Sequence, residues 1–234
     1  MARGRPPKVD HIREDFLFQI EAARRLESAV RPLTTIHPNA ARGLHPKHVY
    51  RTVELAFMGV CAAWEDFVED TLVRYLANAE TDSGYRPRLR VGSCQSISHA
   101  FQVLSGKPAY DPEKVFMTWT NPTSVIDLAE VFFVGGAPFK IPLNREAARL
   151  KHAVKIRNRV AHASEKSRND FREAANYVLQ RAANAPLGKG YRVGELLSSN
   201  ATGYFGVNIP ALQITVFEAY MRLYAQLALE VVPR

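Results

Sequence analysis

The longest helical pattern in this chain runs from Pro46 to Ala79. Mainly apolar side chains recur there at spacings of three and four residues, which is the period of one face of an α-helix. The residues of this stripe are Val53, Phe57, Val60, Trp64, Phe67, Thr71 and Tyr75. Pro46 suits the first helical turn, where its missing N–H is not needed. The same period recurs along the rest of the chain and no strand pattern is evident, so the sequence predicts an all-α fold.

Shorter helical patterns fill the rest of the chain and define the predicted domains. They cover residues 9–30, 96–104, 115–118, 124–134, 170–183, 193–197 and 209–231, with a further helix from Asn144 to about residue 162. Residues 31–46 are rich in proline and are predicted to be a linker. The predicted organisation is a disordered basic tail at 1–8, an N-terminal helix and linker at 9–46, and a helical domain at 47–234.

The charge and the cysteine content of the chain indicate which partners and which cellular compartment to expect. The net charge of +8 favours a polyanionic partner such as nucleic acid. The segment Arg3-Gly4-Arg5-Pro6 resembles an AT-hook core, and a disordered basic tail is the alternative. No apolar run approaches eighteen residues, so no membrane span is predicted. Cys61 and Cys94 do not make a disulfide framework, and Cys61 falls in an apolar helical pattern, which predicts a reducing, cytoplasmic location.

One turn and a half near residue 160 brings together groups that suit a phosphodiester. Arg157 can grip phosphate oxygens with two hydrogen bonds, Asn158 adds an amide, and His162 can move a proton near neutral pH. On a regular helix, Arg157 and His162 differ by about 140° around the axis and about 7.5 Å along it, whereas Asn158 and His162 share a face. Either the helix frays before His162, or the site is completed from elsewhere, for example by a second subunit. The alternative is a surface arginine and a helix-terminal histidine.

Other charged residues are candidates to support this motif. Lys151, Lys155 and Arg159 form a basic face of the same helix and are predicted to contact RNA. Glu65 lies beside the apolar stripe of the long helix, where a half-buried carboxylate needs a partner. It is predicted to pair with an arginine of the bundle or to orient Arg157 or His162. His152 precedes the motif by five residues and could assist it, but it is predicted to be an exposed helix residue. No metal-site spacing is present, so no metal and no cofactor are predicted.

The motif Arg157-Asn158 followed by Ala161-His162 resembles the Arg-x(4–6)-His signature of HEPN-domain ribonucleases. Trp64-Glu65-x-Phe67 on the long helix resembles the first core helix of that superfamily, and the RiboL-PSP-HEPN branch is the most similar. The likeness covers about residues 47–232. It implies a HEPN-type helical bundle of four to five main helices, preceded by an N-terminal helical arm.

The resemblance implies a metal-independent endoribonuclease. In this reaction the RNA 2′-OH loses its proton and attacks the adjacent phosphorus, which leaves a 2′,3′-cyclic phosphate and a 5′-OH. His162 would be the general base or acid, Arg157 would stabilise charge on the phosphoryl oxygens, and Asn158 would hold His162 or a phosphate oxygen.

The resemblance also implies partners. The motif of HEPN nucleases pairs across a homodimer, so two chains supply two histidines to a composite site. An antitoxin or a defence-system protein would be a further partner of a toxin or phage-defence effector. The main alternative is a non-catalytic HEPN module that binds nucleic acid or protein, and a DNA-binding regulator ranks last.

Overall fold

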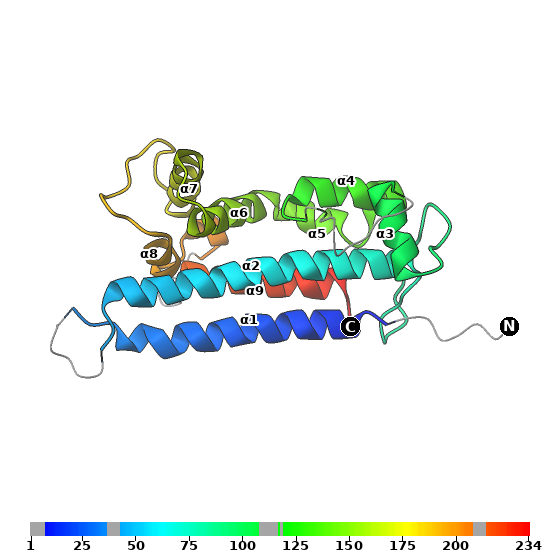
Figure 1. Cartoon of the computed structure of the whole chain (residues 1–234), viewed down its shortest axis with the longest axis horizontal. Coiled ribbons are helices and arrows are strands. Elements are labelled where there is room, and N and C mark those ends of the chain that lie inside the picture. Colours follow the sequence, from blue (N-terminus) through cyan, green and yellow to red (C-terminus); the bar gives the residue numbers. More distant parts are fainter. Residues whose placement is uncertain (1–7, 37–42, 108–116, 118, 208–213) are drawn as a thin grey trace. The chain divides into compact units, whose positions relative to one another are not determined.

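The computed structural model describes residues 8–36, 43–107, 117, 119–207 and 214–234. Within these ranges the chain is helical, with isolated β-bridges and no strands (Figure 1), so the predicted all-α class is confirmed. The main helices are α1 (Asp10–Val30), α2 (Pro46–Leu76), α3 (Ile97–Ser105), α4 (Pro122–Phe132), α5 (Lys140–Arg145), α6 (Ala147–Ala161), α7 (Glu165–Val178), α8 (Val193–Ser198) and α9 (Val216–Val231). The AT-hook-like residues 3–6 and most of the predicted helix at 115–118 lie outside the described residues.

Several predicted helix ends were wrong because capping residues were assigned incorrectly. α4 begins at Pro122, since the Asn121 side chain accepts the Thr123 N–H at 3.1 Å and Pro122 fits the first turn. α6 begins at Ala147 and not at Asn144, which lies in the short helix α5 that the sequence did not predict. α7 begins earlier than predicted, directly after its cap Ser164.

The last helix also begins later than its apolar pattern predicts. Residues 214 and 215 are not helical, and α9 begins at Val216. The Thr215 hydroxyl accepts the Glu218 N–H at 3.2 Å, which satisfies a donor of the first turn. Residues 209–213 of the predicted helix lie outside the described residues.

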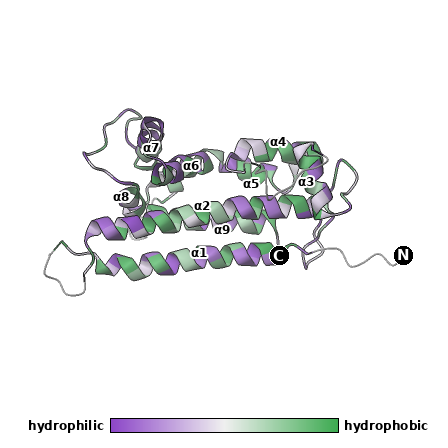
Figure 2. Ribbon diagram, viewed as in Figure 1, coloured by the Kyte–Doolittle hydropathy of each residue, from purple (hydrophilic) through white to green (hydrophobic). Residues whose placement is uncertain are grey.

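The chain divides into two compact units that are not contiguous in sequence. One unit takes residues 1–18, 63–150 and 225–234, and the other takes residues 19–62 and 151–224. The helices α1, α2, α6 and α9 each contribute residues to both. Figure 2 shows hydrophobic and hydrophilic residues alternating along α1 and α2, as the sequence pattern predicts.

Aromatic side chains form the core of the first unit. Phe16 of α1 packs against Trp64 and Phe67 of α2, with ring centroids 5.6 and 5.1 Å away. The buried Tyr75 hydroxyl donates to the Val231 carbonyl of α9 at 3.0 Å. The part of the predicted α2 stripe that lies in this unit, from Trp64 to Tyr75, is therefore buried as predicted.

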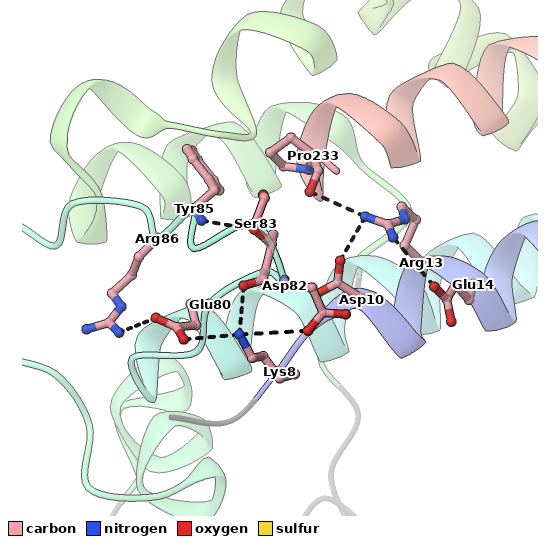
Figure 3. Close-up of polar contacts among 11 residues, drawn as sticks. Lys8, Asp10, Arg13, Glu14, Glu80, Asp82, Ser83, Tyr85, Arg86 and Pro233 are labelled. Carbon is pink, nitrogen blue, oxygen red and sulfur yellow. Dashed lines mark hydrogen bonds and ion pairs between the residues drawn. The ribbon is translucent and has the colours of Figure 1, made fainter. Parts of the chain in front are cut away.

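A polar network fixes both chain ends of the first unit (Figure 3). Lys8 donates to Glu80 at 3.1 Å, in the turn after α2. Arg13 pairs with Asp10 at 3.1 Å and donates to the Val232 carbonyl at 3.0 Å. Lys8 was predicted to belong to a disordered tail, but this ion pair holds it in place.

The second unit has a core of its own around α9. Tyr220 contacts Phe57 of α2 and Phe205, with ring centroids 5.3 and 4.9 Å away. Arg24 of α1 makes two hydrogen bonds to the Glu218 carboxylate, at 2.8 and 3.2 Å. Bidentate pairs of this kind fix the orientation of both side chains.

The two cysteines are free thiols, and both are buried. Cys61 lies on the buried side of α2, as predicted, with its Sγ 3.6 Å from the Tyr224 hydroxyl. Burial raises the pKa of the Cys94 thiol above its usual value. Over the described ranges, no helix combines the length and the apolar character that crossing a bilayer requires.

Candidate functional site

The turn between α6 and α7 holds the histidine of the predicted motif. α6 ends at Ala161, and the His162 N–H still donates to the Asn158 carbonyl at 2.9 Å. Ser164 caps α7 by accepting the Ser167 N–H at 3.2 Å. The Ser167 hydroxyl donates to the His162 carbonyl at 2.8 Å. Hydrogen bonds on both sides therefore fix the backbone of His162, while the residue itself is exposed.

His162 lines a cavity of about 500 Å³ within the second unit. Three segments form the cavity: Arg51 and Glu54 of α2, residues 159–163 at the end of α6, and residues 190–193 before and at the start of α8. The volume is in the range of pockets that hold small molecules. It therefore provides space for a substrate group beside the imidazole.

Three arginines from separate segments line this cavity. Arg51 donates to Glu54 at 3.1 Å, and Arg159 donates to the His162 carbonyl at 3.1 Å. Arg192 is exposed in the loop that leads into α8. A guanidinium carries five N–H donors, so one such bond uses only part of its capacity. Several guanidinium groups around one cavity are suited to binding phosphate oxygens.

The structure places Arg157 away from this cavity. α6 contains Arg157 and Asn158 and stays helical to Ala161, so the turn of the helix separates Arg157 from His162 as the spacing predicts. Arg157 is half-buried, and its Nη1 donates to Asn158 Oδ1 at 3.1 Å. Arg159 lines the cavity, whereas Arg157 and Asn158 do not. The catalytic roles of Arg157 and Asn158 stay predictions.

The other predicted supporting residues lie in different surroundings. Lys151 is exposed on α6. Lys155 forms an ion pair with Glu173 of α7 at 2.7 Å, so its ammonium is already partly neutralised. Glu65 is half-buried, as predicted, and belongs to the first unit. Its role in orienting the motif stays a prediction.

His152 is buried, so its predicted exposure was wrong. It lies on the face of α6 that also buries Ala153 and Ile156. Its Nδ1 is 2.7 Å from the Tyr204 hydroxyl, and its ring stacks on Tyr177 with centroids 4.9 Å apart. Burial lowers the pKa of His152 below its usual value, and the nearby Lys155 lowers it further.

This lowered pKa predicts that the fold weakens in mild acid. The unfolded chain takes up a proton at His152 more readily than the folded chain, so the contribution is complete above the ordinary pKa of 6.5 and is lost as the pH falls below it. We expect the free energy of unfolding to fall less between pH 7 and pH 5 in His152→Gln than in the wild type. Urea denaturation at a series of pH values measures this. An identical pH dependence in both proteins would contradict it.

Four polar residues of the cavity lining were not predicted from the sequence: Arg51, Glu54, Tyr191 and Arg192. A signal was present for Glu54, which precedes Glu65 by eleven residues, or about three helical turns. The two glutamates therefore occupy equivalent positions beside the same apolar stripe. The reasoning that selected Glu65 as a half-buried carboxylate applies equally to Glu54. Tyr191 and Arg192 lie in a loop, where periodicity carries no information.

Tyr191 forms a fixed aromatic part of the cavity. Its ring stacks on Phe171 of α7, with centroids 6.4 Å apart and planes 20° from parallel. Burial, with a smaller effect of the nearby Glu195, raises the pKa of Tyr191 to about 12. The phenol therefore stays neutral at physiological pH and can donate a hydrogen bond to a ligand.

Within the part of the chain that the structure describes, no cluster of three or more His, Cys, Asp or Glu residues is arranged to hold a metal ion. No family model, no curated protein and no solved structure matches this chain.

Proposed function

We propose that this chain is an endoribonuclease whose reaction centre is the cavity beside His162. The observation that carries the proposal is that His162 shares a cavity of about 500 Å³ with three arginines. Imidazole transfers protons near neutral pH, and guanidinium groups bind phosphate and stabilise negative charge on it. The net charge of +8 supports a polyanionic substrate.

RNA fits this set of groups because it carries its own nucleophile. The 2′-hydroxyl attacks the adjacent phosphorus, the bond to the 5′-oxygen breaks, and a 2′,3′-cyclic phosphate remains. His162 transfers one of the two protons that move. Arg159 and Arg192 would neutralise the charge that develops on the phosphoryl oxygens. The protein has only to supply proton transfer and positive charge.

The resemblance to HEPN ribonucleases supports the same reaction. In that family the Arg-Asn-x-x-x-His motif acts in a homodimer, and Arg157 would contribute to such a composite site together with a second copy of this chain. The corresponding biology is a toxin or phage-defence effector that cuts cellular RNA, with an antitoxin or defence-system partner. Arg159, in contrast, would bind phosphate in the cavity of its own chain.

Cleavage of RNA in the presence of EDTA tests the proposal. We expect the purified chain to cut a mixed-sequence single-stranded RNA at a rate that EDTA does not change, and to leave DNA of the same sequence intact because it lacks the 2′-hydroxyl. Mass spectrometry of the products should detect 2′,3′-cyclic phosphate and 5′-hydroxyl ends. Cleavage of the DNA, or products with 3′-hydroxyl ends, would contradict the mechanism. Binding of RNA without any cleavage would favour the non-catalytic module.

A further inference from the structure

A buried carboxylate lies in the same cavity as His162. Glu54 of α2 is only 8% exposed and lines the cavity together with the arginines. Burying a charged group costs free energy unless partners compensate for the lost water, so a buried glutamate needs partners within the protein. Its role can be structural, chemical or both, and the contacts of the two oxygens help to distinguish these.

Among the residues that the structure describes, each oxygen of Glu54 has one donor. The Gly194 N–H donates to Oε1 at 3.0 Å, and Arg51 Nη1 donates to Oε2 at 3.1 Å. Both partners donate hydrogen bonds, and both oxygens of Glu54 accept them. A carboxylate has about four acceptor positions, so two bonds leave capacity on each oxygen for a substrate hydroxyl. The contacts therefore hold the carboxylate in place without using all of its acceptor positions.

The proposed reaction needs two proton transfers, one from the 2′-hydroxyl and one to the 5′-oxygen. Rates are highest when positioned groups carry out both. His162 supplies one of them, and Glu54 is the acid–base group that shares its cavity. The other charged or titratable residues that line this cavity are the three arginines, Tyr191 and His162. A carboxylate oxygen can accept the proton of a hydroxyl group, which is the role of a general base.

We propose that Glu54 is the general base and His162 the general acid of one reaction centre within a single chain. This assignment rests on the proposed ribonuclease function. The Glu54 carboxylate takes the proton of the 2′-hydroxyl, and the 2′-oxygen forms a bond to phosphorus. The bond from phosphorus to the 5′-oxygen breaks, and the protonated imidazole of His162 gives its proton to that oxygen. Glu54 is then protonated and His162 neutral, and exchange with water restores both.

The assignment changes what a second copy of the chain has to contribute. A composite dimer site is required when each chain supplies a single proton-transfer group. Here Glu54, His162 and Arg159 belong to one cavity of one unit, so acid, base and positive charge are all present in one chain. Dimerisation would then add RNA contacts, stability or the positive charge of Arg157, and not a missing proton-transfer group.

The first test compares Glu54→Gln with the wild type. Glutamine keeps the size of the side chain and an oxygen for the Gly194 N–H, but it does not act as a base. We expect the rate of RNA cleavage to fall about 10²–10⁴-fold. We expect the dissociation constant for a non-cleavable 2′-O-methyl RNA to change by less than about threefold, because the phosphate-binding arginines remain. Glu195→Gln, which removes the same charge one residue after Gly194, is the matched control and should cleave like the wild type.

The second test separates the two roles by changing the leaving group. In RNA with a bridging 5′-sulfur at one position, the departing thiolate needs no proton, so a general acid is unnecessary there. We expect His162→Ala to cleave this substrate at close to the wild-type rate, and Glu54→Gln to remain slow. Recovery of Glu54→Gln in place of His162→Ala would reverse the roles and overturn the assignment.

These measurements distinguish failure of the assignment from failure of the function. Wild-type protein that cleaves no RNA overturns both. If Glu54→Gln cleaves RNA as fast as the wild type, only the role of Glu54 is overturned. The same holds if Glu54→Gln loses cleavage and RNA binding to an equal extent. If Glu54→Gln does not fold, cleavage of the 5′-sulfur substrate by His162→Ala still tests the assignment, because Glu54 is intact in that variant. The absence of rescue there would contradict an acid role for His162.

Discussion

Replacing His162 with alanine is expected to lower the rate of RNA cleavage by about 10²–10⁴-fold, the range expected for loss of a positioned proton-transfer group. The fold should be unaffected, because His162 is exposed and its contacts with Asn158 and Ser167 use only backbone atoms. RNA binding should be largely retained, since the arginines of the cavity remain. Single-turnover cleavage measures the first effect, and binding of 2′-O-methyl RNA measures the second.

His11→Ala is the matched control for this variant. His11 is also exposed, but it lies on α1 in the first unit, whereas the cavity residues belong to the second unit. We expect it to cleave RNA like the wild type. Equal activity of His162→Ala and the wild type would remove His162 from the reaction and leave the arginines as a binding site. A similar loss in His11→Ala would show that the loss of cleavage is not specific to the cavity.

The fold was predictable where one face of a long helix is buried. The stripe of α2 is buried in full, from Val53 to Tyr75, because packing against a helical core selects one face every three or four residues. Helix ends were less predictable, since they depend on single capping bonds. Asn121 and Ser164 each start a helix that the apolar pattern placed elsewhere. α5 was missed because six residues are too few to show a period.

The candidate site was only partly predictable, because periodicity locates residues on one helix and not between helices. His162 was identified from the chemistry of its motif, and the separation of Arg157 from it followed from helix geometry. Glu54 joins the cavity through a hydrogen bond to Gly194, which is 140 residues away in sequence. Tyr191 and Arg192 reach the cavity from a loop whose course depends on how α8 packs. No local pattern encodes such a contact.

Gly194→Ala is expected to destabilise the second unit by about 2.5–6 kcal/mol. An added Cβ would lie 2.3 Å from the Tyr50 carbonyl oxygen and 2.6 Å from its carbon, closer than real Cβ atoms approach backbone. Tyr50 is part of α2, whose hydrogen-bonded backbone cannot yield easily, so α8 must move. That movement strains the buried bond from the Gly194 N–H to Glu54. Overpacking costs about 1–3 kcal/mol and a weakened bond to a carboxylate about 1.5–3 kcal/mol. Urea denaturation measures the change in the free energy of unfolding.

Gly59→Ala separates this packing effect from helix propensity. Gly59 is an exposed residue of α2, and an added Cβ there has no atom within 4 Å. Alanine is favoured over glycine in such a helix position by roughly 0.5–1 kcal/mol, so this variant should be slightly more stable than the wild type. Opposite signs for the two variants would show that Gly194 is required by the close approach of α8 to α2. If Gly194→Ala is also stabilising, α8 does not pack this closely on Tyr50, and the fixed position of Glu54 in the cavity would lose its structural basis.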